Sequence, residues 1–105
     1  MNQFVPNMLK IMNIAPARYA KNCLSIQVTD DHGGWKGRQS RLCCAAGCKY
    51  SHREKRYIAS KSKVEVIKKM YDNGWDATYV TNEFETPSGE IIPTYKEAKK
   101  ILNAV

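Results

Sequence analysis

The chain of 105 residues carries 17 lysine and arginine residues against 10 aspartate and glutamate residues, so its formal net charge is +7. Hydrophobic residues make up 43% of the sequence, which is enough for one folded core and excludes an intrinsically disordered chain. Polar residues interrupt every apolar run near the N-terminus before it reaches the length of a signal peptide or a membrane span. We therefore expect one globular domain, residues 1–105, in the cytoplasm and without a membrane partner.

The first predicted element is a short amphipathic helix near the N-terminus. Apolar residues recur there at the spacing of one helical face, at Val5, Met8, Leu9 and Met12. Pro6 fits the first turn of this helix, and Pro16 either ends it or starts a second short turn.

A β-hairpin is expected next. Apolar and polar residues alternate from Leu24 to Thr29, which is typical of a half-buried strand. The sequence "DDHGG" then supplies turn residues. We expect a return strand from Trp35 to about Ala45, with Lys36 and Arg38 on the same face.

The most clearly marked helix follows a short strand over "RYIAS". Ser62 and Glu65 have the spacing of a capping box, and Gly74 stands where a helix C-terminal glycine belongs. The side chains that share the buried face of this helix are Val64, Ile67, Met70 and Tyr71.

The C-terminal part repeats the order of hairpin and helix. Residues 75–92 are expected to form strand, turn and strand, with "TPSG" as the turn. Thr94 and Glu97 form a second capping box before a C-terminal helix. The fold class is therefore α+β: antiparallel β-hairpins with two to three short helices packed on one face.

The excess of positive charge is local. Between Lys36 and Lys63 the chain carries nine basic residues and a single acid, Glu54, which gives this segment a charge of +8. The rest of the chain has eight basic residues against nine acids. A local excess of positive charge indicates a polyanionic partner more strongly than the same charge spread over the whole surface does. The alternative is a solvated basic face that only aids solubility.

Aromatic residues lie among these cations, a pattern typical of nucleic-acid binding because cations contact phosphates and aromatic rings stack on bases. We expect residues 35–63 to be the binding segment, with Trp35 or Tyr50 offering a stacking face. The candidate contacts with DNA or RNA are Lys36, Arg38, Arg41, Lys49, Tyr50, Arg53, Lys55 and Arg56. The alternative is a small regulatory or inhibitory protein, such as a viral accessory factor, whose basic face docks on an acidic surface of a host protein.

The cysteine cluster has three interpretations. The first is structural zinc. The spacing between Cys44, Cys48 and His52 is close to the spacing of ligands in known structural zinc sites. A fourth ligand would come from Cys23, Cys43 or His32. The second interpretation is that the thiols are reduced, buried and apolar. The third is redox or nucleophilic use, for which Cys48 is the best candidate because His52 and basic residues lie close to it in sequence.

No catalytic signature accompanies this cluster. The sequence has no C-x-x-C motif, no phosphate-binding glycine loop, no G-x-S-x-G elbow and no H-E-x-x-H motif. Asp30, Asp31 and His32 are better explained as a polar turn than as a hydrolytic cluster. The sequence therefore favours a non-enzymatic binding protein, with zinc as its one candidate cofactor.

Overall fold

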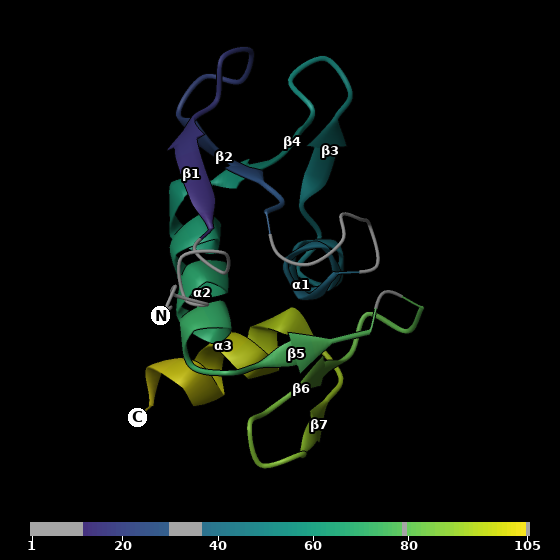
Figure 1. The fold of residues 1–105 in the computed structure, drawn as a ribbon. Coiled ribbons are helices and arrows are strands. Elements are labelled where there is room, and N and C mark those ends of the chain that lie inside the picture. The colour runs from purple at the N-terminus through teal and green to yellow at the C-terminus, as the bar shows by residue number, and fades with distance from the viewer. Residues whose placement is uncertain (1–11, 30–36, 79, 105) are drawn as a thin grey trace, which may run out of the picture.

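The protein is described by a computed structural model over residues 12–29, 37–78 and 80–104. Within these ranges the chain forms three helices and two antiparallel sheets, so the α+β prediction is confirmed (Figure 1). In chain order the elements are β1 (Asn13–Pro16), β2 (Cys23–Gln27), α1 (Arg38–Ala45), β3 (Lys49–Ser51), β4 (Arg56–Ser60), α2 (Lys61–Asp72), β5 (Asp76–Ala77), β6 (Phe84–Glu85), β7 (Ile91–Ile92) and α3 (Tyr95–Asn103).

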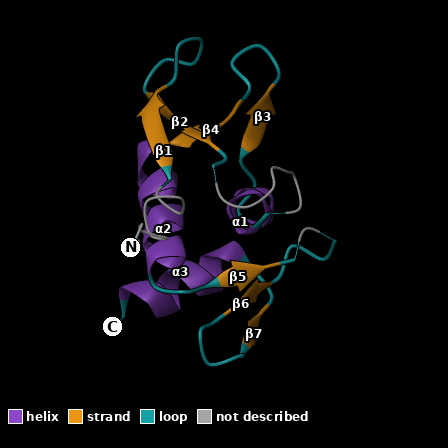
Figure 2. Ribbon diagram, in the orientation of Figure 1, coloured by secondary structure: helices purple, strands orange, loops and turns teal. Residues whose placement is uncertain are grey.

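The larger sheet has the strand order β1-β2-β4-β3, and the smaller sheet has the order β5-β6-β7. Figure 2 shows α1 between the two sheets, α2 against the larger sheet and α3 beside the smaller one. In the larger sheet Ile26 of β2 is paired with Tyr57 of β4, and both side chains are buried. Pro16 is the last residue of β1, an edge strand, where a missing backbone N–H breaks no internal ladder.

The N-terminal helix predicted from Val5 to Met12 lies outside the described residues, except for Met12. Met12 directly precedes β1 and is 5% exposed, so it belongs to the core. None of the helices in the described part of the chain is both long enough and apolar enough to cross a membrane.

The return strand predicted from Trp35 to about Ala45 is wrong, because Arg38–Ala45 is the helix α1. Gln39, Leu42, Cys43 and Ala46 are buried at spacings of three and four residues, which is the period of a helix. The buried amide of Gln39 is satisfied because its Oε1 accepts the backbone N–H of Thr29 at 2.8 Å.

Helix α2 confirms the predicted helix and its buried face, but it starts earlier than predicted. Its N-cap is Ser60, whose hydroxyl accepts the backbone N–H of Lys63 at 3.3 Å, so the capping box predicted at Ser62 is wrong by two residues. Gly74 follows the helix with a φ of +88°, a conformation that costs glycine little.

Helix α3 begins at the predicted place. Thr94 is the N-cap, and its hydroxyl accepts the backbone N–H of Glu97 at 3.2 Å. Ala98 and Leu102 face inward, one helical turn apart.

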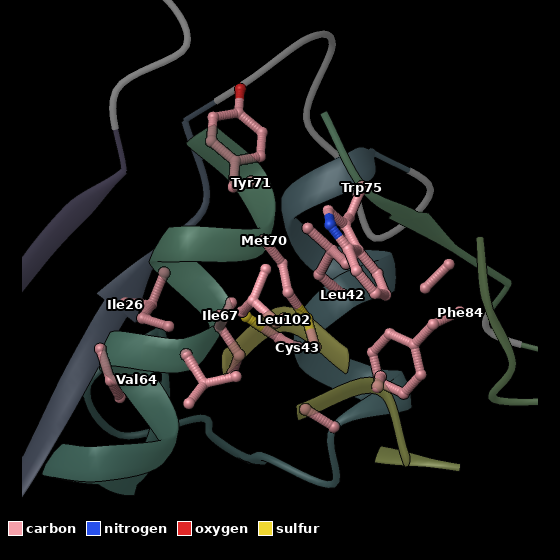
Figure 3. Close-up of a cluster of buried hydrophobic side chains, with 14 of the residues drawn as sticks. Ile26, Leu42, Cys43, Val64, Ile67, Met70, Tyr71, Trp75, Phe84 and Leu102 are labelled. Atoms are coloured by element: carbon pink, nitrogen blue, oxygen red, sulfur yellow. The ribbon is translucent and has the colours of Figure 1, made fainter. Parts of the chain in front are cut away.

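One cluster of buried side chains joins all these parts (Figure 3). Phe84 of the smaller sheet and Ile26 of the larger sheet are both 0% exposed and belong to this cluster. Helix α2 contributes Ile67 and Met70, which Figure 3 shows among the side chains of the neighbouring elements. The two hairpin and helix units therefore share a core.

Candidate nucleic-acid interface

Arg38 makes contacts within the protein rather than projecting from it. Its guanidinium donates to the backbone carbonyl of Tyr71 at 3.2 Å and to that of Trp75 at 2.6 Å. The same group lies 3.9 Å from the centre of the Tyr71 ring. Arg38 thus neutralises the carbonyl-rich C-terminal end of α2, where a cation is favourable.

Two further arginines connect elements of the fold. Arg41 forms a two-pronged ion pair with Asp76, at 2.9 and 3.1 Å, which links α1 to β5. Arg56 donates to the Ser25 hydroxyl at 2.7 Å and to the Asn13 carbonyl at 2.8 Å, across β4, β2 and β1. These two residues, like Arg38, therefore have structural partners.

The other predicted contacts lie on the hairpin of β3 and β4. Lys49, Arg53 and Lys55 are exposed there, and Tyr50 is 40% exposed. The Tyr50 ring meets His52 edge-on, with 5.1 Å between ring centres. Predicted contacts at Lys36 and Trp35 lie outside the described residues.

The loop between β1 and β2 joins the same surface, and Figure 1 shows both loops projecting at the end of the larger sheet farthest from β5–β7. The Glu54 carboxylate accepts the backbone N–H groups of Arg18 at 2.9 Å and Tyr19 at 3.1 Å. The Arg53 guanidinium lies 4.4 Å from the centre of the Tyr19 ring. Glu54 and Arg53 thus fix one loop against the other.

We name this surface the paired loops. It comprises Arg18, Tyr19, Lys21, Lys49, Tyr50, His52, Arg53, Glu54 and Lys55. The acid in this set, Glu54, is engaged with backbone amides, while Arg18, Lys21, Lys49, Arg53 and Lys55 are exposed. Tyr19 is 55% exposed, so an aromatic ring lies among the cations.

Three residues of the paired loops were not predicted as contacts from the sequence: Arg18, Tyr19 and Lys21. The charge excess was located between Lys36 and Lys63, and these three residues precede that segment. The signal was nevertheless present, because "ARYAKN" places a tyrosine between two cations over a few residues.

The predicted zinc ligands have different neighbours in the structure. The Cys44 thiol lies 3.4 Å from the Tyr57 hydroxyl, whereas His52 lies on the exposed hairpin against Tyr50. Across the described ranges, no three histidine, cysteine, aspartate or glutamate side chains are grouped where they could hold a metal ion. Zinc binding by Cys44, Cys48 and His52 stays a prediction from spacing alone.

Tyr57 lies within the hairpin, on β4, and its side chain is buried. Burial, with a smaller effect of its hydrogen bond to Cys44, raises the pKa of Tyr57 well above its ordinary value. The Tyr57 hydroxyl also lies 2.9 Å from the hydroxyl of Ser40. The folded protein therefore keeps this phenol neutral at a pH at which the unfolded chain ionises it.

Stability should consequently fall above about pH 10, the ordinary pKa of tyrosine. The unfolded state then binds fewer protons than the folded state, so the free energy of unfolding should decrease by up to about 1.4 kcal/mol per pH unit. Urea unfolding between about pH 8 and pH 11 measures this slope. In Tyr57→Phe the slope should become shallower, with Tyr19→Phe as the matched control, because it removes a hydroxyl from a tyrosine that is 55% exposed. An unchanged slope in Tyr57→Phe would show that another group controls alkaline stability.

Comparison of the chain with protein-family models, with curated proteins and with solved structures finds no match. The paired loops must therefore be interpreted from their own geometry and charge.

Proposed function

We propose that this chain is a non-enzymatic nucleic-acid-binding protein of the cytoplasm, and that the paired loops are its contact surface. The observation that carries the proposal is the junction of the two loops, where Glu54 binds the backbone of one loop and Arg53 covers Tyr19. This junction gathers cations from two segments far apart in sequence.

The chemistry of the surface suits a phosphate backbone. Arg18, Lys21, Arg53 and Lys55 can approach phosphates from two sides, and each contact releases condensed counterions. Exposed tyrosine rings offer faces or edges to unpaired bases, which stack on aromatic side chains with little regard to sequence. The surface therefore fits contact with the backbone better than it fits readout of bases.

Three of the arginines stabilise the fold and are not expected to bind nucleic acid. Arg38, Arg41 and Arg56 hold the elements beneath the loops, and substitutions there act first on stability. Binding in the proposal depends on Arg53 and Lys55, which are exposed at the tip.

The test is the affinity for fluorescent single-stranded and duplex oligonucleotides, measured by anisotropy at increasing salt. The Arg53→Glu, Lys55→Glu double variant should bind about 10- to 100-fold more weakly, and its log–log salt slope should fall by about 2. The matched control is Lys96→Glu, Lys100→Glu on α3, which changes the net charge equally at two exposed positions.

An equal loss in both double variants would contradict the proposal, because binding would then depend on net charge and not on the paired loops. Absence of salt-dependent binding by the wild-type protein would also contradict it. A protein that co-purifies after nuclease treatment, and that the tip variant loses, would favour the acidic protein partner instead.

A further inference from the structure

Helix α1 ends in a backbone motif that brings two cysteines together. The N–H of Gly47 donates to the carbonyl of Cys44 at 3.0 Å, and the N–H of Cys48 donates to the carbonyl of Cys43 at 3.0 Å. Gly47 has a φ of +82°, the left-handed conformation that this reversal needs. These features define a Schellman motif, in which the side chains at the positions of Cys43 and Cys48 usually touch.

The thiols of this pair interact, while the adjacent Cys44 faces elsewhere. A hydrogen bond from Cys43 is the main cause of a lowered pKa at Cys48, against the opposing effect of burial. The Cys44 thiol instead lies 3.4 Å from the hydroxyl of Tyr57. Two neighbouring cysteines in the sequence thus have different hydrogen-bond partners in the fold.

Cys48 has the surroundings of a nucleophilic thiol. The positive charge of Lys63 also lowers the pKa of Cys48. The Lys63 ammonium lies 5.1 Å from the centre of the Tyr95 ring. The hydroxyl of Tyr95 is buried and has no hydrogen-bond partner among the described residues. Cys48 is partly exposed, whereas Cys43 is 0% exposed. A small reagent can therefore reach Cys48 first.

We propose that Cys43 and Cys48 form a dithiol site that a hydroperoxide oxidises to an intramolecular disulfide. The Cys48 thiolate attacks the terminal peroxide oxygen, the O–O bond breaks, and the departing oxygen takes a proton to leave as water or an alcohol. Cys48 is then a sulfenic acid. The Cys43 sulfur attacks the Cys48 sulfur, the S–OH bond breaks, and the Cys43 proton leaves with that hydroxyl as water.

The overall change is balanced. Two thiols lose two electrons and two protons, and the peroxide gains them. In a reducing compartment such a disulfide is transient, as expected for a site that responds to peroxide rather than one that supports the fold. The bond would tie the end of α1 to the residue before β3. Oxidation of Cys43 and Cys48 does not require the paired loops to bind nucleic acid.

The experiment treats the reduced full-length protein with an equimolar amount of hydrogen peroxide and measures its intact mass. We expect the loss of two hydrogen atoms, reversed by dithiothreitol. Free thiols are then alkylated, and the disulfide is reduced and labelled with a second reagent. Fragmentation of the peptide spanning residues 42–49 should place the first label on Cys44 and the second on Cys43 and Cys48.

Alanine variants give matched controls. Cys44→Ala and Cys23→Ala should form the disulfide at the wild-type rate. Cys43→Ala should instead accumulate a sulfenic acid at Cys48 that dimedone traps, and Cys48→Ala should form no disulfide. Lys63→Gln should slow the reaction and shift its pH profile to higher pH.

A second label on Cys44 in the wild-type protein would overturn the assignment, and this measurement needs no variant. Disulfide formation in Cys48→Ala would overturn it too. So would a wild-type protein that gains only oxygen atoms without losing hydrogen, because Cys43 would then not reach the oxidised sulfur.

Discussion

Replacing Phe84 with alanine is expected to destabilise the whole protein by about 3–5 kcal/mol. Phe84 belongs to the two-residue strand β6, and its side chain is 0% exposed. Its ring lies 6.2 Å from that of Tyr95, and it belongs to the same buried cluster as Ile26 of the larger sheet. Removal of the ring leaves a cavity in a core that both sheets share, so its effect should not stay within the smaller sheet.

Hydrogen exchange under native conditions tests this shared core directly. In Phe84→Ala the amides of Ile26 and Ile58, in the larger sheet, should lose protection in parallel with those of β6. Ile91→Ala is the matched control, because Ile91 lies in the adjacent strand β7 but is 52% exposed. The control should cost less than about 1 kcal/mol. Unchanged protection at Ile26 in Phe84→Ala would show that the smaller sheet unfolds by itself.

The helices whose signals are local could be predicted from the sequence. Around α2 and α3 the apolar spacing, the capping residues and the terminal glycine act within one or two helical turns, so no tertiary partner is needed to recognise them. The N-cap of α2 was predicted at Ser62 and lies instead at Ser60. Both residues are serines of the same stretch, and Ser60 is also the last residue of β4.

Helix α1 could not be predicted in this way because its buried face is partly polar. Ser40 and Gln39 are 2% and 0% exposed, and their partners lie in other elements. The Ser40 hydroxyl pairs with that of Tyr57, and the Gln39 amide pairs with Thr29. A residue whose burial depends on a distant hydrogen bond has no periodic signal of its own.

The candidate site shows the same limit. Sequence counting treats every arginine as an available cation, but Arg41 is paired with Asp76 and Arg56 with β1 and β2. Conversely, the loop that carries Arg18 and Tyr19 joins the surface only through Glu54, a contact across 35 and 36 positions of the chain. Local charge density therefore indicated the hairpin of Arg53 and Lys55, but not the neighbouring loop.

Arg38 was predicted as a nucleic-acid contact, and its substitution should instead produce the second large loss of stability. In Arg38→Met the carbonyls of Tyr71 and Trp75 lose a charged donor, and the Tyr71 ring loses a cation 3.9 Å from its centre. Hydrogen bonds to charged groups contribute about 1.5–3 kcal/mol, and a cation–π contact adds about 1 kcal/mol. The expected destabilisation is about 2–4 kcal/mol by urea unfolding.

Arg53→Met is the matched control, because it makes the same chemical change at the exposed tip. Its cation–π contact with Tyr19 is on the surface, so the loss of stability should stay below about 1 kcal/mol. Nucleic-acid affinity should respond in the opposite order: Arg53→Met weakens it, and folded Arg38→Met leaves it unchanged. If Arg38→Met kept full stability but lost affinity, the guanidinium would have to leave the end of α2 to reach the ligand. The distinction between structural and binding arginines would then be wrong.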